Sequence, residues 1–111
     1  MKPSVGRIVL YNLTSLDSER INKRRNDAQA SRVSEQNQGG QVHVGSYVQA
    51  GDTVPVIVTK VWAEDSINGQ AMLDGNDTLW LHSIPQAPAE PETGDRDFSI
   101  VRGFWGWPPR V

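Results

Sequence analysis

The chain has 111 residues, a formal net charge of −2 and no cysteine. This length fits one domain over residues 1–111 with a thin core, and the missing cysteines exclude disulfides and thiolate metal sites. The balance of 11 basic and 13 acidic residues argues against binding nucleic acid through bulk charge. No apolar run is long enough for a signal peptide or a membrane span, so we expect a soluble protein that stays where it is made.

The first predicted elements are a strand and a helix. Val5–Tyr11 (VGRIVLY) is rich in β-branched residues and predicts a strand. Thr14 and Asp17 match a capping box, which places the start of a helix near Ser15. The helix can run to about Ser34, because no Gly or Pro interrupts it. Its apolar residues are few, so we expect it to be mostly exposed to water or to complete its burial against another subunit.

A loop and a central strand come next. The Gly pair in Asn37–Gln41 predicts the end of the helix and a loop. After the turn QAGD, Val54–Trp62 is apolar on both faces, which predicts a strand in the middle of a sheet or in a barrel. Trp62 and Trp80 stand within predicted strands, so we expect both in the core.

The second half of the chain predicts hairpins. Asn68–Gly69 is a strong hairpin signal. Strands follow at QAML (70–73) and TLWLHSI (78–84), and Asp74–Gly75 predicts a tight turn between them because both residues accept positive φ. Residues 85–97, rich in Pro and acid, predict an exposed loop.

Short strands joined by tight turns predict a mainly β (α+β) fold. We expect a small SH3-like curled sheet or barrel, with one helix inserted after the first strand at about 15–34.

The stretch LDGNDTLWL contains the densest group of carboxylates between apolar residues. The hairpin turn is the favoured interpretation, and Asn76 and Asp77 are candidate contacts for a ligand at its rim. A calcium loop would need further oxygen ligands at alternate positions and a later Glu, which this stretch lacks. We therefore predict no metal site here.

The helix concentrates basic and amide side chains in RINKRRND. One interpretation is a solvated helix with i,i+4 ion pairs such as Lys23–Asp27. The other is that arginines and asparagines bind a phosphate-bearing ligand bidentately, at a subunit interface. The candidate ligand-binding residues of the helix are Asn22, Arg24, Arg25, Asn26 and Arg32.

The terminal FWGWPPRV places two indoles on one side of an extended chain, because Trp105 and Trp107 have the same parity. They either close one end of a thin barrel or stack on a flat base. His43 and His82 lack partners at metal-binding or catalytic spacing. We therefore predict no catalytic residue and no cofactor.

With these motifs, the chain resembles a group of short proteins from tailed bacteriophages and prophages. They begin like MKPSVGRIVLY, carry a helix like DSERINKRRND, share NGQAMLDGNDTLWLHSI and end in an aromatic–Trp–Pro signature, here GFWGWPPRV. Many of them have Trp–His–Trp–Pro where this chain has Gly106 between its two tryptophans. The resemblance implies phage origin and expression in the host bacterial cytoplasm.

In this context we expect a phage accessory protein that is not an enzyme. It would bind and sequester a host nucleotide signal of cyclic or ADP-ribose type, as a homo-oligomer, with arginines on the phosphates and aromatic rings on the bases. The alternatives are a structural or decoration protein of the virion, or an SH3-like inhibitor of a host protein.

Overall fold

The computed structural model describes residues 2–33, 42–87 and 103–109. Its elements are β1 (Ile8–Asn12), α1 (Ser15–Val33), β2 (Thr53–Val61), β3 (Ser66–Met72), β4 (Thr78–Pro85) and β5 (Trp105–Gly106). The strands form one antiparallel sheet in the order β4-β3-β2-β1-β5. The mainly β prediction, with one helix inserted after the first strand, is confirmed.

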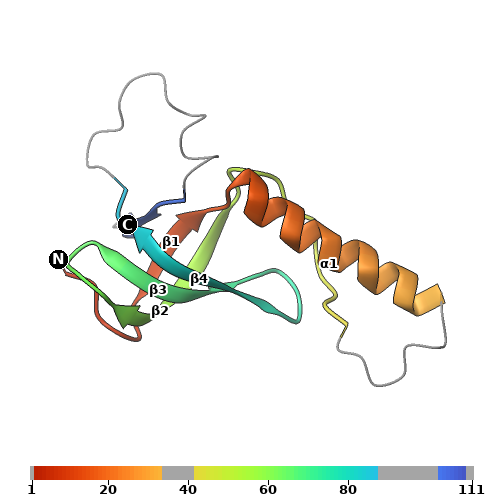
Figure 1. The fold of residues 1–111 in the computed structure, drawn as a ribbon, viewed down its shortest axis with the longest axis horizontal. Helices are drawn as coiled ribbons and strands as arrows, with labels where there is room; N and C mark the ends of the chain where they lie inside the picture. Colours follow the sequence, from red (N-terminus) through yellow and green to blue (C-terminus); the bar gives the residue numbers. More distant parts are fainter. Residues whose placement is uncertain (1, 34–41, 88–102, 110–111) are drawn as a thin grey trace.

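The sheet curls until its two edge strands approach each other (Figure 1). A bridge joins Gln86, just after β4, to Trp105 of β5, and the Ala87 N–H donates to the Trp105 carbonyl at 2.7 Å. The result is a curled half-barrel whose inner face holds the core.

Strand β2 shows how that core is built. It lies between β1 and β3, as predicted for a central strand. Val54, Val56 and Val58 point inward and are buried, whereas the residues between them are exposed. Although both faces of β2 are largely apolar, only one face of the sheet packs on the core, and no described residue covers the other, as antiparallel sheets allow.

Trp105 closes the core. Its side chain is fully buried, and its indole N–H donates to the Asp65 carbonyl at 2.8 Å. Of the two interpretations of the terminal tryptophans, the core plug holds for Trp105. Trp107 packs edge-on against it, with ring centroids 5.4 Å apart.

Asn68–Gly69 does not form the predicted hairpin turn. Both residues lie inside β3, and the turn that joins β2 to β3 occupies residues 62–65. A Cβ on Gly69 would clash with Cγ1 of Val56, so glycine is needed here for close packing between strands. The Asn68 Oδ1 accepts hydrogen bonds from the Trp62 indole at 2.8 Å and the Ser83 N–H at 2.7 Å, beside an irregularity in the β3–β4 register.

Trp62 and Trp80 are not core residues, contrary to expectation. Each is more than half exposed on the open side of the sheet. Trp80 stacks on His82 with ring centroids 5.0 Å apart, and Lys60 Nζ lies 3.9 Å from the Trp62 ring centroid.

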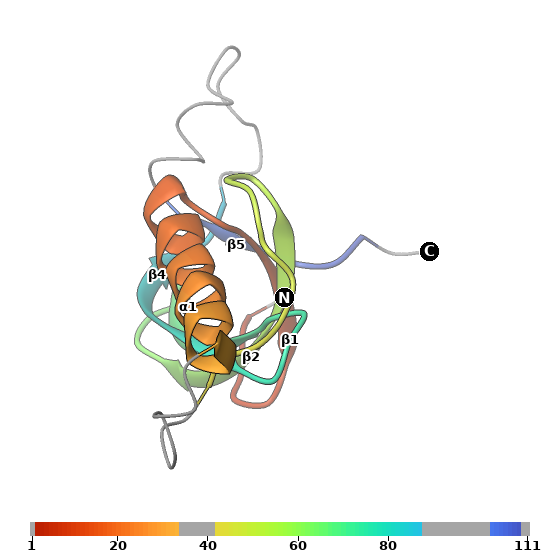
Figure 2. The ribbon, with the colours of Figure 1, turned by 90° about the vertical axis from the view of Figure 1, so that its right-hand side faces the viewer.

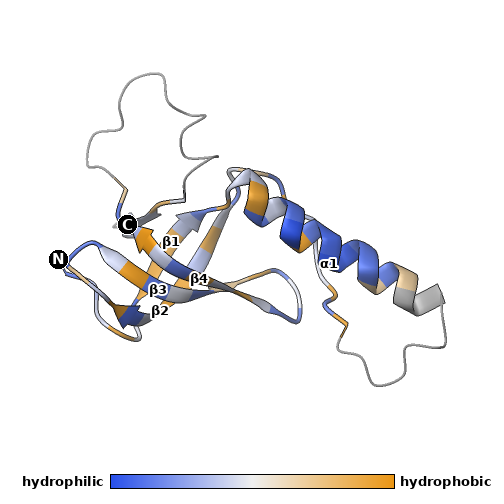
Figure 3. Ribbon diagram, viewed as in Figure 1, coloured by the Kyte–Doolittle hydropathy of each residue, from blue (hydrophilic) through white to orange (hydrophobic). Residues whose placement is uncertain are grey.

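Helix α1 begins where the capping box predicts. The Asp17 N–H donates to the Thr14 hydroxyl and the Thr14 N–H donates to the Asp17 carboxylate, each at 3.1 Å. The helix surface is mostly polar (Figure 3), and its axis runs away beside the sheet instead of across it (Figures 1 and 2). A narrow stripe of α1 is buried, consisting of Asp17, Ser18, Ile21, Arg25 and Ala28. Apolar packing against the strands is thus limited, and polar contacts must position the helix.

Among the predicted boundaries, those of the helix and of the strands at Val54–Trp62 and 78–84 lie within one residue of the observed ones, whereas the strand predicted at 70–73 begins four residues earlier, at Ser66. β1 starts three residues later than expected, after a turn in which Gly6 has a φ of +91°. The loop predicted at Asn37–Gln41 lies outside the described residues, as do residues 88–97 of the predicted acidic loop.

Candidate functional site

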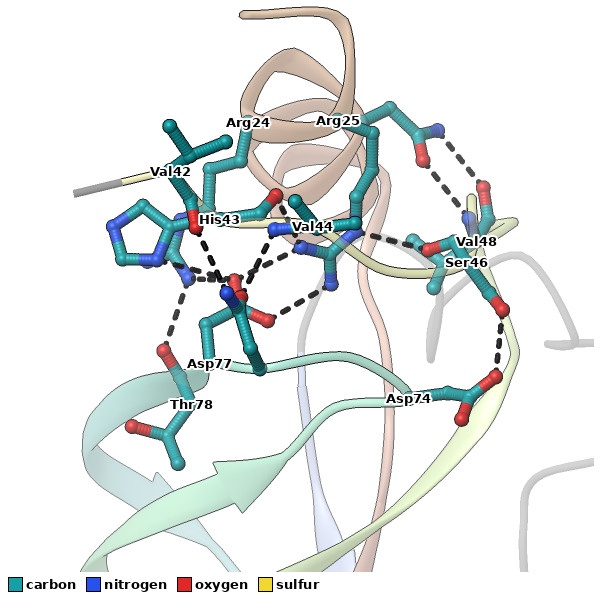
Figure 4. Close-up of polar contacts among 12 residues, drawn as sticks. Arg24, Arg25, Val42, His43, Val44, Ser46, Val48, Asp74, Asp77 and Thr78 are labelled. Carbon is teal, nitrogen blue, oxygen red and sulfur yellow. Dashed lines mark hydrogen bonds and ion pairs between the residues drawn. The ribbon is translucent and has the colours of Figure 1, made fainter. Parts of the chain in front are cut away.

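Residues 42–48 run between α1 and the β3–β4 turn, residues 73–77, without joining the sheet as a strand. We call the contact of these three pieces the clasp (Figure 4). An extended segment outside a sheet must find other partners for its backbone groups. Here, side chains of α1 and of the turn supply most of them.

Arg25 is the centre of the clasp. Its side chain is 1% exposed, and its Nη1 and Nη2 donate to the two carboxylate oxygens of Asp77 at 3.1 and 3.0 Å. Its Nε donates to the Ser46 carbonyl at 3.1 Å, and Nη1 also donates to the His43 carbonyl at 2.8 Å. The planar guanidinium therefore ties the helix to residues 42–48 and to the turn at once.

Asp77 supplies the counter-charge. Its side chain is 2% exposed and also accepts a hydrogen bond from Nη1 of Arg24 at 2.8 Å. Burial opposes ionisation of this carboxyl, but the hydrogen bonds and positive charges of Arg25 and Arg24 outweigh it, so the pKa of Asp77 is lowered. The carboxylate is ionised at neutral pH and holds both arginines.

Two asparagines bond the ends of residues 42–48. Asn22 of α1 accepts from the Val48 N–H at 2.8 Å and donates to the Val48 carbonyl at 2.9 Å. Asn76 of the turn accepts from the Val44 N–H and donates to the Val42 carbonyl, each at 2.9 Å. Each amide thus bonds backbone groups that a neighbouring strand would otherwise bond, so both Asn22 and Asn76 have structural partners within the chain.

Gly45 and Gly75 let the clasp close. They form an isolated antiparallel bridge, and a Cβ on Gly45 would stand 2.6 Å from the Gly75 Cα and 2.9 Å from the Arg25 Cζ. The predicted turn between two strands at Asp74–Gly75 is confirmed, because residues 73–77 join β3 to β4. Its expected positive φ is not found at either residue. Gly75 is needed for close approach of two backbones.

The structure brings together only some of the predicted ligand-binding residues. Arg24, Arg25 and Asp77 meet directly, and Asn26 lies beside them and accepts a hydrogen bond from the Tyr47 hydroxyl at 2.8 Å. The side chain of Arg32 lies outside the described residues.

Trp105 and Trp107 do not belong to the clasp. Figure 1 shows the C-terminal residues on the opposite side of the sheet from residues 42–48. Trp105 has no exposed surface on which a base could stack. A single chain therefore does not combine the helix arginines with these two indoles in one site.

Sequence reasoning set His43 aside and did not single out Ser46 or Tyr47. The Ser46 hydroxyl donates to the Asp74 carboxylate at 2.6 Å, and Nδ1 of His43 lies 3.8 Å from Asp77 Oδ2, buried but without a hydrogen bond to the described residues. No local signal could have identified them, because their partners are 21 to 34 residues away in the chain.

Three further features describe what this part of the chain can and cannot hold. The described residues include no group of three or more His, Asp or Glu side chains arranged to hold a metal ion. A hollow of about 150 Å³ lies beside Arg25, lined by Ala28, Gln29, Val44, Gly45 and Tyr47. Within the same residues, α1 is too polar to cross a lipid bilayer.

Comparisons with known protein families, with curated proteins and with solved structures find no match for this chain. Fold and site nevertheless define a structural class. The protein is a small curled half-barrel to which a polar helix is held by a buried Arg–Asp ion cluster.

Proposed function

We propose that the protein is a phage accessory protein that binds a nucleotide of the host in the bacterial cytoplasm and sequesters it without turnover. The observation that carries this proposal is the state of Arg24. Its Nη1 donates to Asp77 at 2.8 Å and to the Thr78 carbonyl at 2.9 Å, while its side chain stays 28% exposed. Nε and Nη2 have no hydrogen-bond partner among the described residues, so a fixed guanidinium presents one unused edge.

Such an edge suits a phosphate group. Two parallel N–H donors match two phosphate oxygens, and a guanidinium already held in place loses little conformational entropy on binding. The two arginines of the clasp carry one positive charge more than Asp77 neutralises. The carboxylate of Asp74 lies at the other side of the clasp, bound by the Ser46 hydroxyl, whereas His43 stands beside Arg24 (Figure 4).

This proposal divides the roles that the sequence assigned jointly to the two arginines. Arg25 is enclosed and positions the clasp, whereas Arg24 contacts the ligand. The hollow beside Arg25 is smaller than the ~300–1,000 Å³ of common ligand pockets. We therefore place the phosphate on the exposed edge of Arg24 and not inside that hollow.

The choice of a nucleotide rests on the resemblance to phage proteins together with this phosphate-binding edge. The test uses isothermal titration calorimetry with four probes: ADP-ribose, cyclic di-AMP, inorganic pyrophosphate and adenosine. We expect at least one phosphorylated nucleotide to bind and to be recovered unchanged. Adenosine should not bind, because it has no phosphate group for Arg24 to contact.

Variants at neighbouring cations give the decisive comparison. Arg24→Gln removes charge-assisted hydrogen bonds worth ~1.5–3 kcal/mol, which corresponds to roughly a 10- to 100-fold rise in Kd. Lys23→Gln removes an equal charge from an exposed side chain one position away and should change Kd by less than about threefold. Equal affinities of the two variants would contradict the site. Failure of both nucleotides to bind, or stoichiometric amounts of the protein in purified virions, would contradict the function.

A further inference from the structure

The outer face of the sheet carries a row of side chains that are apolar or aromatic apart from Gln70. The register places Ile8 of β1 opposite Ile57 of β2, Ile57 opposite Gln70 of β3, and Gln70 opposite Trp80 of β4. Ile8, Ile57 and Trp80 are 55%, 36% and 57% exposed, and Met72, two residues from Gln70 on the same face, is 43% exposed. The row crosses four strands, and no described segment covers it.

This outer face is almost free of charge. Strands β1 to β4 contain no Asp or Glu, and Lys60 is their one Lys or Arg residue. The Lys60 ammonium already lies over the Trp62 ring. Depletion of charge together with Trp and Met marks the centres of protein interfaces.

The area of the face fits a contact between two protein molecules. A buried aromatic side chain covers ~150–250 Å², so the exposed parts of Trp62 and Trp80 amount to roughly 200 Å². With Ile8, Ile57 and Met72 the apolar patch reaches roughly 400–500 Å², near the upper range for a monomer. Two such patches and their polar rims would bury ~1,200 Å² or more, the lower limit for a stable interface.

We propose that this outer face binds the same face of a second copy of the chain, giving a twofold homodimer. In a twofold contact the same patch of each copy forms the interface. A charged patch would therefore face like charges in its partner, whereas this face, with few charges, avoids that repulsion. Two sheets packed in this way stand about 10 Å apart and interdigitate their side chains, as in a β-sandwich. Complementary charges orient an unlike partner on a binding surface, and this face has too few charges to do so.

The test is the mass of the purified full-length protein, measured by light scattering after size-exclusion chromatography over a dilution series without ligand. We expect a dimer for the wild type. Ile8→Lys places a charge in the apolar row, and Met72→Lys does so from another strand. Both should halve the mass while the far-ultraviolet circular dichroism remains native.

Leu16→Lys is the matched control, because Leu16 is 54% exposed but lies on α1, away from the face. It should remain a dimer. A wild-type monomer at all concentrations would overturn the proposal, including the case in which the face then captures another protein. Retention of the dimer in Ile8→Lys and Met72→Lys, or its loss in Leu16→Lys, would overturn it as well. Because no nucleotide is present, the result is independent of the proposed function.

Discussion

The buried contact between Arg25 and Asp77 predicts a large loss of stability when one partner is removed. Asp77→Ala takes away the acceptor of hydrogen bonds from both arginines at 2.8 to 3.1 Å. It leaves the Arg25 guanidinium charged and 1% exposed, without a counter-ion. Breaking a buried pair in this way costs ~3–5 kcal/mol, a large part of the ~5–15 kcal/mol that stabilises a typical domain.

Urea unfolding, followed by tryptophan fluorescence and extrapolated to water, measures this loss. Asp27→Ala is the matched control, because the Lys23–Asp27 contact is equally short at 2.9 Å but its side chains are 77% and 65% exposed. That exposed i,i+4 pair should be worth ~0.5 kcal/mol or less. The double variant Arg25→Ala/Asp77→Ala should lose less than the sum of the single losses, since no unpaired buried charge remains.

Equal losses for Asp77→Ala and Asp27→Ala would refute this reasoning. They would mean that the clasp opens at little cost, and that Arg25 is not confined to a positioning role. Hydrogen exchange at residues 42–48 would then be fast in the wild type, since these backbone groups depend on the clasp.

The other predictions concern a glycine and two titrating groups. Gly69→Ala should cost ~1–3 kcal/mol in urea unfolding because its Cβ meets Val56, whereas Gly106→Ala, with open space around it, should stay within ~0.5 kcal/mol of the wild type. Burial, and then the hydrogen bond to Asp17, raises the pKa of the Tyr11 phenol. The free energy of unfolding should therefore fall above about pH 10, where the unfolded chain ionises, and fall less steeply in Tyr11→Phe. The pKa of Asp77 is lowered, so its contribution is complete above about pH 4 and is lost as the pH drops through the folded value. Acid titration of the unfolding free energy should accordingly be shallower in Asp77→Ala.

The elements that the sequence predicts well are those encoded by near neighbours. The capping box of Thr14 and Asp17 predicts the start of α1, and the apolar run Val54–Trp62 predicts β2 to within one residue. Alternation along a strand shows that it has two faces but not which face another layer covers, which is why Trp80 was expected in the core. The Asn68–Gly69 dipeptide suits a hairpin turn, but it equally suits an irregular strand position where the neighbouring backbone comes close.

The site was less predictable than the fold. Arg25 and Asp77 are 52 residues apart in the chain, and nothing near either residue indicates the other. The sequence singled out both as polar groups with possible ligand roles, yet the fold pairs them with each other. Distinguishing Arg24 from Arg25 required their difference in burial, which depends on how residues 42–48 cross the helix.

Native mass spectrometry of the protein purified from infected bacteria tests the central claim, nucleotide binding, most directly. It reports the subunit number and any retained ligand in one spectrum. The proposals predict a dimer whose mass exceeds that of two chains by one nucleotide per subunit. The Arg24→Gln variant should lose this mass excess and remain a dimer. A protein that carries no nucleotide in infected cells, or the same mass excess in Arg24→Gln, would contradict the proposed function at this site.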